Sequence, residues 1–151
     1  MSESTIQTVE TESVLQSVQL TEQRIVLFDG VCGLCSHTVD YLLRHDPHGR
    51  LRFAPLQGTT ADELVPKDVQ GRLDTMVYSR QGILYYRSAA VVRMLRDLGG
   101  LQTALGTLLW LVPGPLRDFG YRCVSTVRYR LFGKHETCRM PTLEERSRFL
   151  D

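Results

Sequence analysis

The chain lacks the features of secreted, membrane-spanning and nucleic-acid-binding proteins. Its N-terminus has no basic segment followed by an apolar stretch and a small-residue cleavage site, so the sequence predicts no secretory signal. The longest apolar run, 101–112, is stopped by Pro113-Gly114-Pro115 and is too short to span a bilayer. We expect a buried helix there, with contact to a membrane surface as the minority interpretation. No tract of clustered basic residues is present, which argues against nucleic-acid binding.

The charges are spread unevenly along the chain. Of its 151 residues, 42% are hydrophobic and 23% are charged, as is usual for a soluble protein of one domain. The net charge is +1, but residues 1–23 carry four glutamates and no Lys or Arg, so the remainder carries +5. This polar composition predicts a disordered acidic tail over 1–23 and one folded domain over 24–151.

Cysteines are few, and two of the four lie close together as a Cys-X-X-Cys motif. Cys32 and Cys35 follow an apolar run at 25–28 and a turn at 29–31, and an amphipathic stretch begins at Ser36. This order predicts a strand, a tight loop and a helix, with Cys32 at the helix N-terminus. Aligned peptide dipoles favour a thiolate there, and such cysteines have pKa values lowered from about 8.5 to about 3.5–7.5. Without a signal we expect a cytoplasmic protein, in which this motif is redox-catalytic or metal-binding rather than structural.

The remaining pattern predicts an α/β fold, with a thioredoxin-like βαβ-ββα core and additional C-terminal helices. The helix after the motif has one apolar face, and a strand at 51–55 should run parallel to the first because a helical crossover joins them. Two β-rich runs, 76–78 and 83–86, predict a hairpin across 79–82. Ser88 is the expected N-cap of the next helix, which should end at Gly99-Gly100.

The C-terminal third predicts further helices. One should begin near Leu101, and another near Leu116 with an apolar stripe formed by Phe119, Cys123, Val127 and Leu131. Thr142 and Glu145 have the spacing of a capping box for a short terminal helix. Cys123 is therefore expected in the core, where a free cysteine behaves as a small hydrophobe.

Several segments together resemble a known family. The run Leu27-Phe28-Asp29-Gly30-Val31-Cys32-Gly33-Leu34-Cys35, and the segment 128–134 followed by Cys138 and Pro141, resemble the DCC family of thiol-disulfide oxidoreductases. The resemblance covers about residues 24–150 and includes the pairs 46–47, 56–57, 88–89 and 117–118. The Asp, Cys, Cys signature that names the family corresponds to Asp29, Cys32 and Cys35. It implies a thiol-disulfide oxidoreductase.

The leading hypothesis gives each signature residue a role. Cys32 is the nucleophile, and Cys35, one helical turn deeper, resolves the mixed disulfide. Asp29 either shuttles a proton to or from Cys35 or caps the loop through backbone N–H groups. The substrate would be a disulfide-containing protein or a low-molecular-weight thiol. We expect neither a cofactor nor a bound metal.

The alternative is a zinc-binding or interaction module. It would use Cys32, Cys35 and Cys138 with either His135 or Cys123, because a structural zinc site needs four sulfur or nitrogen ligands. The second pair lacks the spacing of a zinc knuckle, and we favour a structural role for Cys138. Thioredoxins carry a cis-proline before the third strand, whereas this chain has Thr75 in the corresponding segment.

Overall fold

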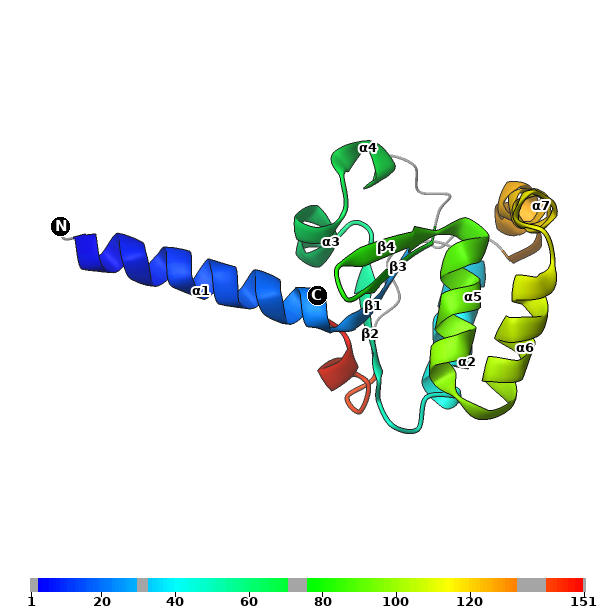
Figure 1. The fold of residues 1–151 in the computed structure, drawn as a ribbon, viewed down its shortest axis with the longest axis horizontal. Coiled ribbons are helices and arrows are strands. Elements are labelled where there is room, and N and C mark those ends of the chain that lie inside the picture. The colour runs from blue at the N-terminus through cyan, green and yellow to red at the C-terminus, as the bar shows by residue number, and fades with distance from the viewer. Residues whose placement is uncertain (1–2, 30–32, 71–75, 133–140, 151) are drawn as a thin grey trace.

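A computed structural model describes residues 3–29, 33–70, 76–132 and 141–150 (Figure 1). The described part contains a four-stranded sheet in the order β2-β1-β3-β4. The strands are β1 (Arg24–Phe28), β2 (Leu51–Pro55), β3 (Val77–Arg80) and β4 (Ile83–Tyr86). The helical elements are α1 (Glu3–Glu22), α2 (Gly33–Arg44), α3 (Thr59–Leu64), α4 (Lys67–Gln70), α5 (Arg87–Leu98), α6 (Gly100–Leu111), α7 (Gly114–Phe132) and the 3-10 turn η1 (Arg146–Arg148).

The strand directions confirm the predicted thioredoxin-like core. β1 and β2 are parallel, with α2 as the crossover between them, whereas β1 pairs antiparallel with β3 and β3 with β4. The hairpin is tighter than predicted because β3 continues to Arg80. Gln81 and Gly82 alone form its turn, with φ values of 52° and 77°. Two successive positive φ angles give the turn a twist that matches the flanking strands.

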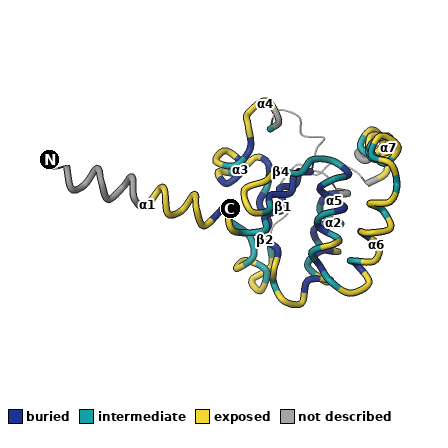
Figure 2. The backbone as a smooth tube through the Cα atoms, viewed as in Figure 1, coloured by how far each residue is buried: buried dark blue, intermediate teal, exposed yellow. Residues whose placement is uncertain are grey.

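Both faces of the sheet are covered, and the alternation of side chains along β1 explains why. Val26 and Phe28 belong to a cluster with residues of α2 and α5, whereas Ile25 and Leu27 belong to a second cluster with residues of α3. Figure 1 shows α2 and α5 on one side of the sheet and α3 on the other. β1 is therefore buried on both faces and forms the centre of the fold (Figure 2).

The predicted apolar face of α2 is confirmed, and its packing sets the position of Cys35. Cys35, Val39 and Leu42 are buried in the cluster over β1, and Leu43 packs against its edge. The helix ends at Arg44, just before Asp46-Pro47 as expected. Buried Asp46 then accepts hydrogen bonds from the backbone N–H groups of Arg50 (3.0 Å) and Leu51 (2.8 Å), which joins the turn to β2.

The N-terminal segment differs from the disordered tail expected from composition. Residues Glu3–Glu22 form the helix α1, which points away from the sheet (Figure 1). This segment contains no Gly or Pro, so nothing in it interrupts a helix. Of its side chains that the structure describes, Leu20 alone is buried, in the cluster with Ile25 and Leu27.

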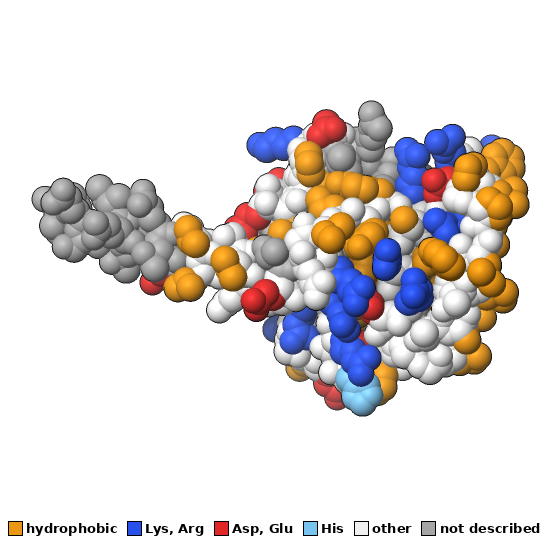
Figure 3. Space-filling model, viewed as in Figure 1, with side chains coloured by type: hydrophobic (Ala, Val, Ile, Leu, Met, Phe, Trp, Pro, Cys, Tyr) orange, Lys and Arg blue, Asp and Glu red, His pale blue; other side chains and the backbone are white. Residues whose placement is uncertain are grey.

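The C-terminal helices exist as predicted, but their packing is not as predicted. We expected α6 to be buried, yet Leu101, Leu108 and Leu111 are exposed, and Gln102 and Gly106 are its buried residues. The stripe on α7 was expected to face the core, but all four of its residues are exposed, namely Phe119, Cys123, Val127 and Leu131. Apolar side chains accordingly reach the surface along the side of α6 and α7 (Figure 3). The core assignment of Cys123 is wrong.

The C-terminus returns to the sheet through polar and aromatic contacts. Thr142 and Glu145 form the predicted capping box, in which the Thr142 N–H donates to Glu145 (3.0 Å) and the Glu145 N–H donates to the Thr142 hydroxyl (3.4 Å). The structured turn after it is the 3-10 turn η1. Arg148 forms a salt bridge with Asp46, and the Phe149 ring lies 5.6 Å from that of Phe53.

Candidate functional site

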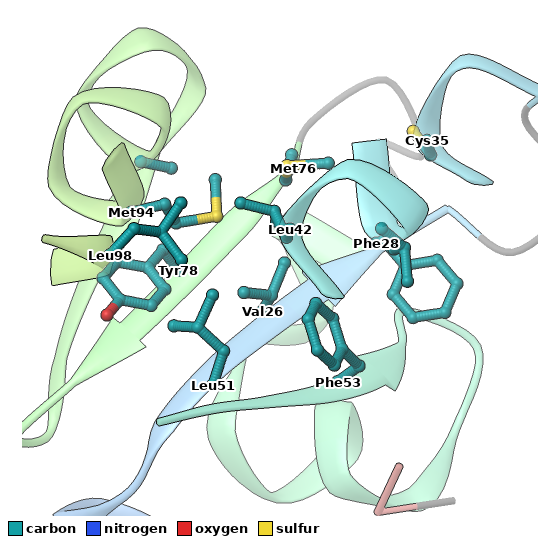
Figure 4. Packing of buried hydrophobic residues seen from close by; sticks show 12 residues of the cluster. Val26, Phe28, Cys35, Leu42, Leu51, Phe53, Met76, Tyr78, Met94 and Leu98 are labelled. Atoms are coloured by element: carbon teal, nitrogen blue, oxygen red, sulfur yellow. The ribbon is translucent and has the colours of Figure 1, made fainter. Parts of the chain in front are cut away.

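The candidate site lies where β1 ends and α2 begins. Cys35 is the third residue of α2, is 4% exposed and lies at the edge of the core cluster (Figure 4). Cys32 immediately precedes this helix in the sequence, but it is outside the described residues. A thiolate next to the first turn of a helix is stabilised by unpaired backbone N–H groups. The start of α2 at Gly33 thus supplies the local environment on which the redox hypothesis depends.

Asp29 lies at the same edge of the sheet, directly after β1, and is 1% exposed. Its carboxylate accepts a hydrogen bond of 3.1 Å from the side-chain amide of Gln57. Gln57 follows β2, and the Leu56 N–H donates to the Phe28 carbonyl at 2.8 Å, which holds the two strand ends together. Parallel pairing of β1 with β2 is therefore what brings Gln57 to Asp29.

A cavity of about 490 Å³ opens beside Cys35, between α2, α5, α6 and α7. Its wall is mostly apolar, with Met76 from the segment before β3, Val91 from α5 and Leu109 from α6. Cys35 lines it from α2, and α7 contributes residues between Leu116 and Ser125. Cavities of this size are typical of sites for small molecules, which occupy about 300–1,000 Å³.

The polar part of the cavity is built around Ser88. Its buried hydroxyl donates a hydrogen bond to the Asp118 carboxylate and accepts one of 3.0 Å from Nε of Arg117. The expected capping role of Ser88 is wrong, because the N-cap of α5 is Tyr86 and the serine bonds to α7 instead. Nearby, the Met76 N–H donates to the Tyr121 hydroxyl at 3.0 Å. These bonds attach α7 to the core at the rim of the cavity.

The residues of the zinc alternative are largely beyond the described part of the chain. Cys32, His135 and Cys138 are outside it, as is Thr75, so these predictions stay predictions. Within the described ranges, no three His, Cys, Asp or Glu side chains are grouped as a metal site would require. Cys123 is exposed on α7. It is therefore a second thiol that any redox experiment must take into account.

A family model matches residues 26–134, and its description is DCC1-like thiol-disulfide oxidoreductase. The chain belongs to this family. The match begins within β1, the strand before the motif, and covers the other three strands, α6 and α7. The resemblance inferred from the sequence is confirmed, and membership implies a substrate that is a thiol or a disulfide.

Two relatives support the assignment. The protein YuxK of Bacillus subtilis strain 168 is 36% identical over 129 residues, which cover 84% of this chain and 93% of YuxK. A chloroplastic DCC family protein of Arabidopsis thaliana is 30% identical over 118 residues, covering 77% of this chain and 69% of the plant protein. No solved structure matches the chain. None of the described helices is long and apolar enough to cross a membrane.

The sequence alone does not reveal the contacts that several residues make at the candidate site. Gln57, Ser88, Arg117 and Asp118 belong to the short pairs that carried the family resemblance, and none was given a role at the site. The structure brings Gln57 to Asp29 and joins Ser88 to Arg117 and Asp118. The signal that could have indicated these contacts was the polar residues that the chain shares with the family outside the Asp, Cys, Cys signature.

Proposed function

We propose that this protein is a thiol-disulfide oxidoreductase whose nucleophile is Cys32 and whose resolving residue is Cys35. The observation that carries the proposal is the buried Cys35 in the first turn of α2, in the wall of a cavity. Cys32 precedes Cys35 by three positions in the sequence, the spacing of a Cys-X-X-Cys dithiol. Family membership supports the same class of reaction.

The proposed reaction transfers two electrons in two exchange steps. The Cys32 thiolate attacks one sulfur of a substrate disulfide, the substrate S–S bond breaks, and one substrate sulfur leaves as a thiolate. Cys35 then loses its proton and attacks the Cys32 sulfur of the mixed disulfide, which releases the second substrate thiolate. The protein is left oxidised, with a Cys32–Cys35 disulfide, and the substrate is left as two thiols. The reverse sequence oxidises a substrate dithiol.

The roles of the cysteines are tested by trapping the intermediate in a Cys123→Ser background, which removes the exposed competing thiol. In Cys35→Ser protein, a disulfide substrate should remain attached to Cys32, because no resolving thiol is present, and mass spectrometry should detect the adduct. In Cys32→Ser protein the adduct should be absent and turnover lost. Cys138→Ser is the matched control and should behave like its parent. Normal turnover by Cys32→Ser would refute the assignment.

For Asp29 we retain two proposals, because the buried carboxylate with its Gln57 bond is compatible with both. As a proton shuttle, it would accept the Cys35 proton during resolution. As a structural group, it would cap the loop through backbone N–H groups. Alkylation of the thiols as a function of pH distinguishes them. Asp29→Asn should change the curve if the carboxylate acts on the dithiol and leave it superimposable on that of the parent if its role is structural.

We place this activity in a reducing compartment, the cytoplasm, on the basis of the small number of cysteines and the exposed thiol of Cys123. The Arabidopsis relative is named as chloroplastic. Fractionation of cells that express the native chain tests the placement, and recovery in a secreted fraction would contradict it.

A further inference from the structure

The cavity beside Cys35 has a composition that narrows the substrate class of the proposed reaction. Its walls come from four helices and the segment before β3, and the wall residues Met76, Val91, Leu109, Leu116 and Val124 are apolar. An apolar molecule that enters such a space gains about 25 cal/mol for each Å² of apolar surface removed from water. Hydroxyl groups of Thr38, Ser88, Tyr121 and Ser125 also line the space, but most of its surface is apolar.

One permanent cation lies in this mostly apolar wall. Arg117 lines the cavity and is half-buried, and its Nε donates to the Ser88 hydroxyl. A guanidinium has five N–H donors, and among the described residues Nε is the only one of its nitrogens that donates a hydrogen bond. Asp118 is bonded to the same hydroxyl. The Ser88 hydroxyl therefore bonds to both Arg117 and Asp118 of α7. Its bond to Nε positions the Arg117 guanidinium at the cavity.

We propose that the cavity binds a small apolar molecule that carries a carboxylate at one end and a disulfide or dithiol at the other. The apolar walls would take its hydrocarbon part, Arg117 would pair with the carboxylate, and the sulfur atoms would lie at the part of the wall that contains Cys35. The inference rests on the proposed function and names its substrate class. A folded protein with an exposed disulfide is the alternative, and it makes no use of an apolar space of about 490 Å³ beside Cys35.

The binding part of this proposal is tested without any redox chemistry. Octanoate has the hydrocarbon and the carboxylate but no sulfur, and octanamide replaces the charge with a neutral amide. By isothermal titration calorimetry, octanoate should bind the full chain, and Arg117→Gln should weaken it about tenfold or more. The same substitution should leave octanamide binding within about twofold. Octanoate that fails to bind, or binds both proteins equally, would overturn the proposal.

A steric variant tests the location of the site. A Cβ atom on Gly120, which lines the cavity, would meet nothing within 4 Å, so Gly120→Phe can place a ring in this space without a clash at its base. It should abolish octanoate binding. Gly114→Phe is the matched control, because Gly114 also has an open Cβ position and lies on α7 away from the lining. Equal octanoate binding by the two variants would contradict the assigned location.

The redox part uses three dithiols of related chemistry to reduce the Cys32–Cys35 disulfide. Each reagent attacks one protein sulfur, forms a mixed disulfide and closes its own ring, so that two electrons and two protons pass to the protein. Dihydrolipoate should have a kcat/KM at least tenfold above that of dithiothreitol, which has no tail, with dihydrolipoamide between them. Gly120→Phe should remove the advantage of dihydrolipoate. Equal rates for all three would overturn the substrate class.

These outcomes separate the two proposals. If the disulfide never forms but octanoate still binds in an Arg117-dependent manner, the proposed function fails and the ligand site stands. If the disulfide forms and dithiothreitol reduces it as fast as dihydrolipoate, the proposed function stands and the substrate class fails.

Discussion

Helix α5 packs against its neighbours in different ways on its two sides. On the side toward the sheet, α5 and α2 share a core cluster whose side chains are almost fully buried from solvent, such as Val26, Phe53 and Met94. Away from the sheet, α6 and α7 are attached by the close approach of Gly106 and by polar bonds of Ser88 and Tyr121. We infer that the inner layer supplies most of the folding free energy, whereas the outer helices complete the cavity and leave much apolar surface exposed.

The largest difference should appear when one phenylalanine is truncated in each layer. Phe53 is 0% exposed and Phe119 is 65% exposed. Phe53→Ala should lower the unfolding free energy by about 3–5 kcal/mol, because it leaves a cavity in the core. Phe119→Ala should change it by no more than about 0.5 kcal/mol. Urea titration measures both, and similar losses would show that Phe119 has a packing partner.

A smaller effect is expected from two glycines of the outer helices. A Cβ atom on Gly106 would lie 2.9 Å from the Leu95 Cβ and 3.0 Å from the Arg96 backbone nitrogen, whereas one on Gly120 would meet nothing within 4 Å. Gly106→Ala should cost about 1–3 kcal/mol through overpacking, partly offset by the better helix propensity of alanine. Gly120→Ala should stabilise by about 0.5–1 kcal/mol. Thermal unfolding of both variants checks the contrast, and a stabilising Gly106→Ala would contradict close packing of α6 on α5.

The smallest effect is the pH dependence of the unfolding free energy, which tests whether Tyr78 is buried in the inner layer. Tyr78 is buried and donates a hydrogen bond of 2.7 Å to Asp97, and burial together with that carboxylate raises its pKa well above the ordinary 10.0. As the pH rises, Tyr78 in the folded protein keeps its proton at pH values where Tyr78 in the unfolded chain has lost it. The contribution of Tyr78 to the unfolding free energy is therefore fully present below about pH 10. Above that pH the unfolding free energy falls, by at most about 1.4 kcal/mol per pH unit.

The measurement is the unfolding free energy between pH 9 and pH 11. Tyr78→Phe should reduce the alkaline fall, and the part that remains is expected from Tyr86, whose pKa is also raised by burial. Tyr41→Phe removes a hydroxyl that joins α2 to Gln102 of α6 and should keep the fall, because Tyr78 is still present. Identical slopes for the parent and Tyr78→Phe would exclude Tyr78 as the source.

The sequence predicted the inner layer well because local patterns there coincide with tertiary burial. Val39 and Leu42 follow Cys35 at helical spacing, and they are buried as expected. Alternation could not show that β1 is covered on both faces, but the crossover and the hairpin correctly predicted its neighbours. The turn at Gln81-Gly82 was placed within a longer loop because strand ends are set by pairing rather than by residue type.

The outer helices show where such patterns fail. An apolar stripe indicates that a helix has an apolar face, but it does not show that a partner covers that face. The stripe with Phe119 and Cys123 is exposed, and contact with the core falls instead to Arg117, Tyr121 and neighbouring residues. The bond from Ser88 to Asp118 links residues thirty positions apart, and sequence spacing alone could not indicate it. The cavity depends on these long-range contacts and was therefore not predicted.

The most direct test of the central claim is a redox titration of Cys123→Ser protein in glutathione buffers, followed by alkylation and mass spectrometry. The account predicts one reversible two-electron transition in which the chain loses two hydrogen atoms and a bond joins Cys32 to Cys35. Both cysteines remaining available to the alkylating reagent at every glutathione ratio would contradict it.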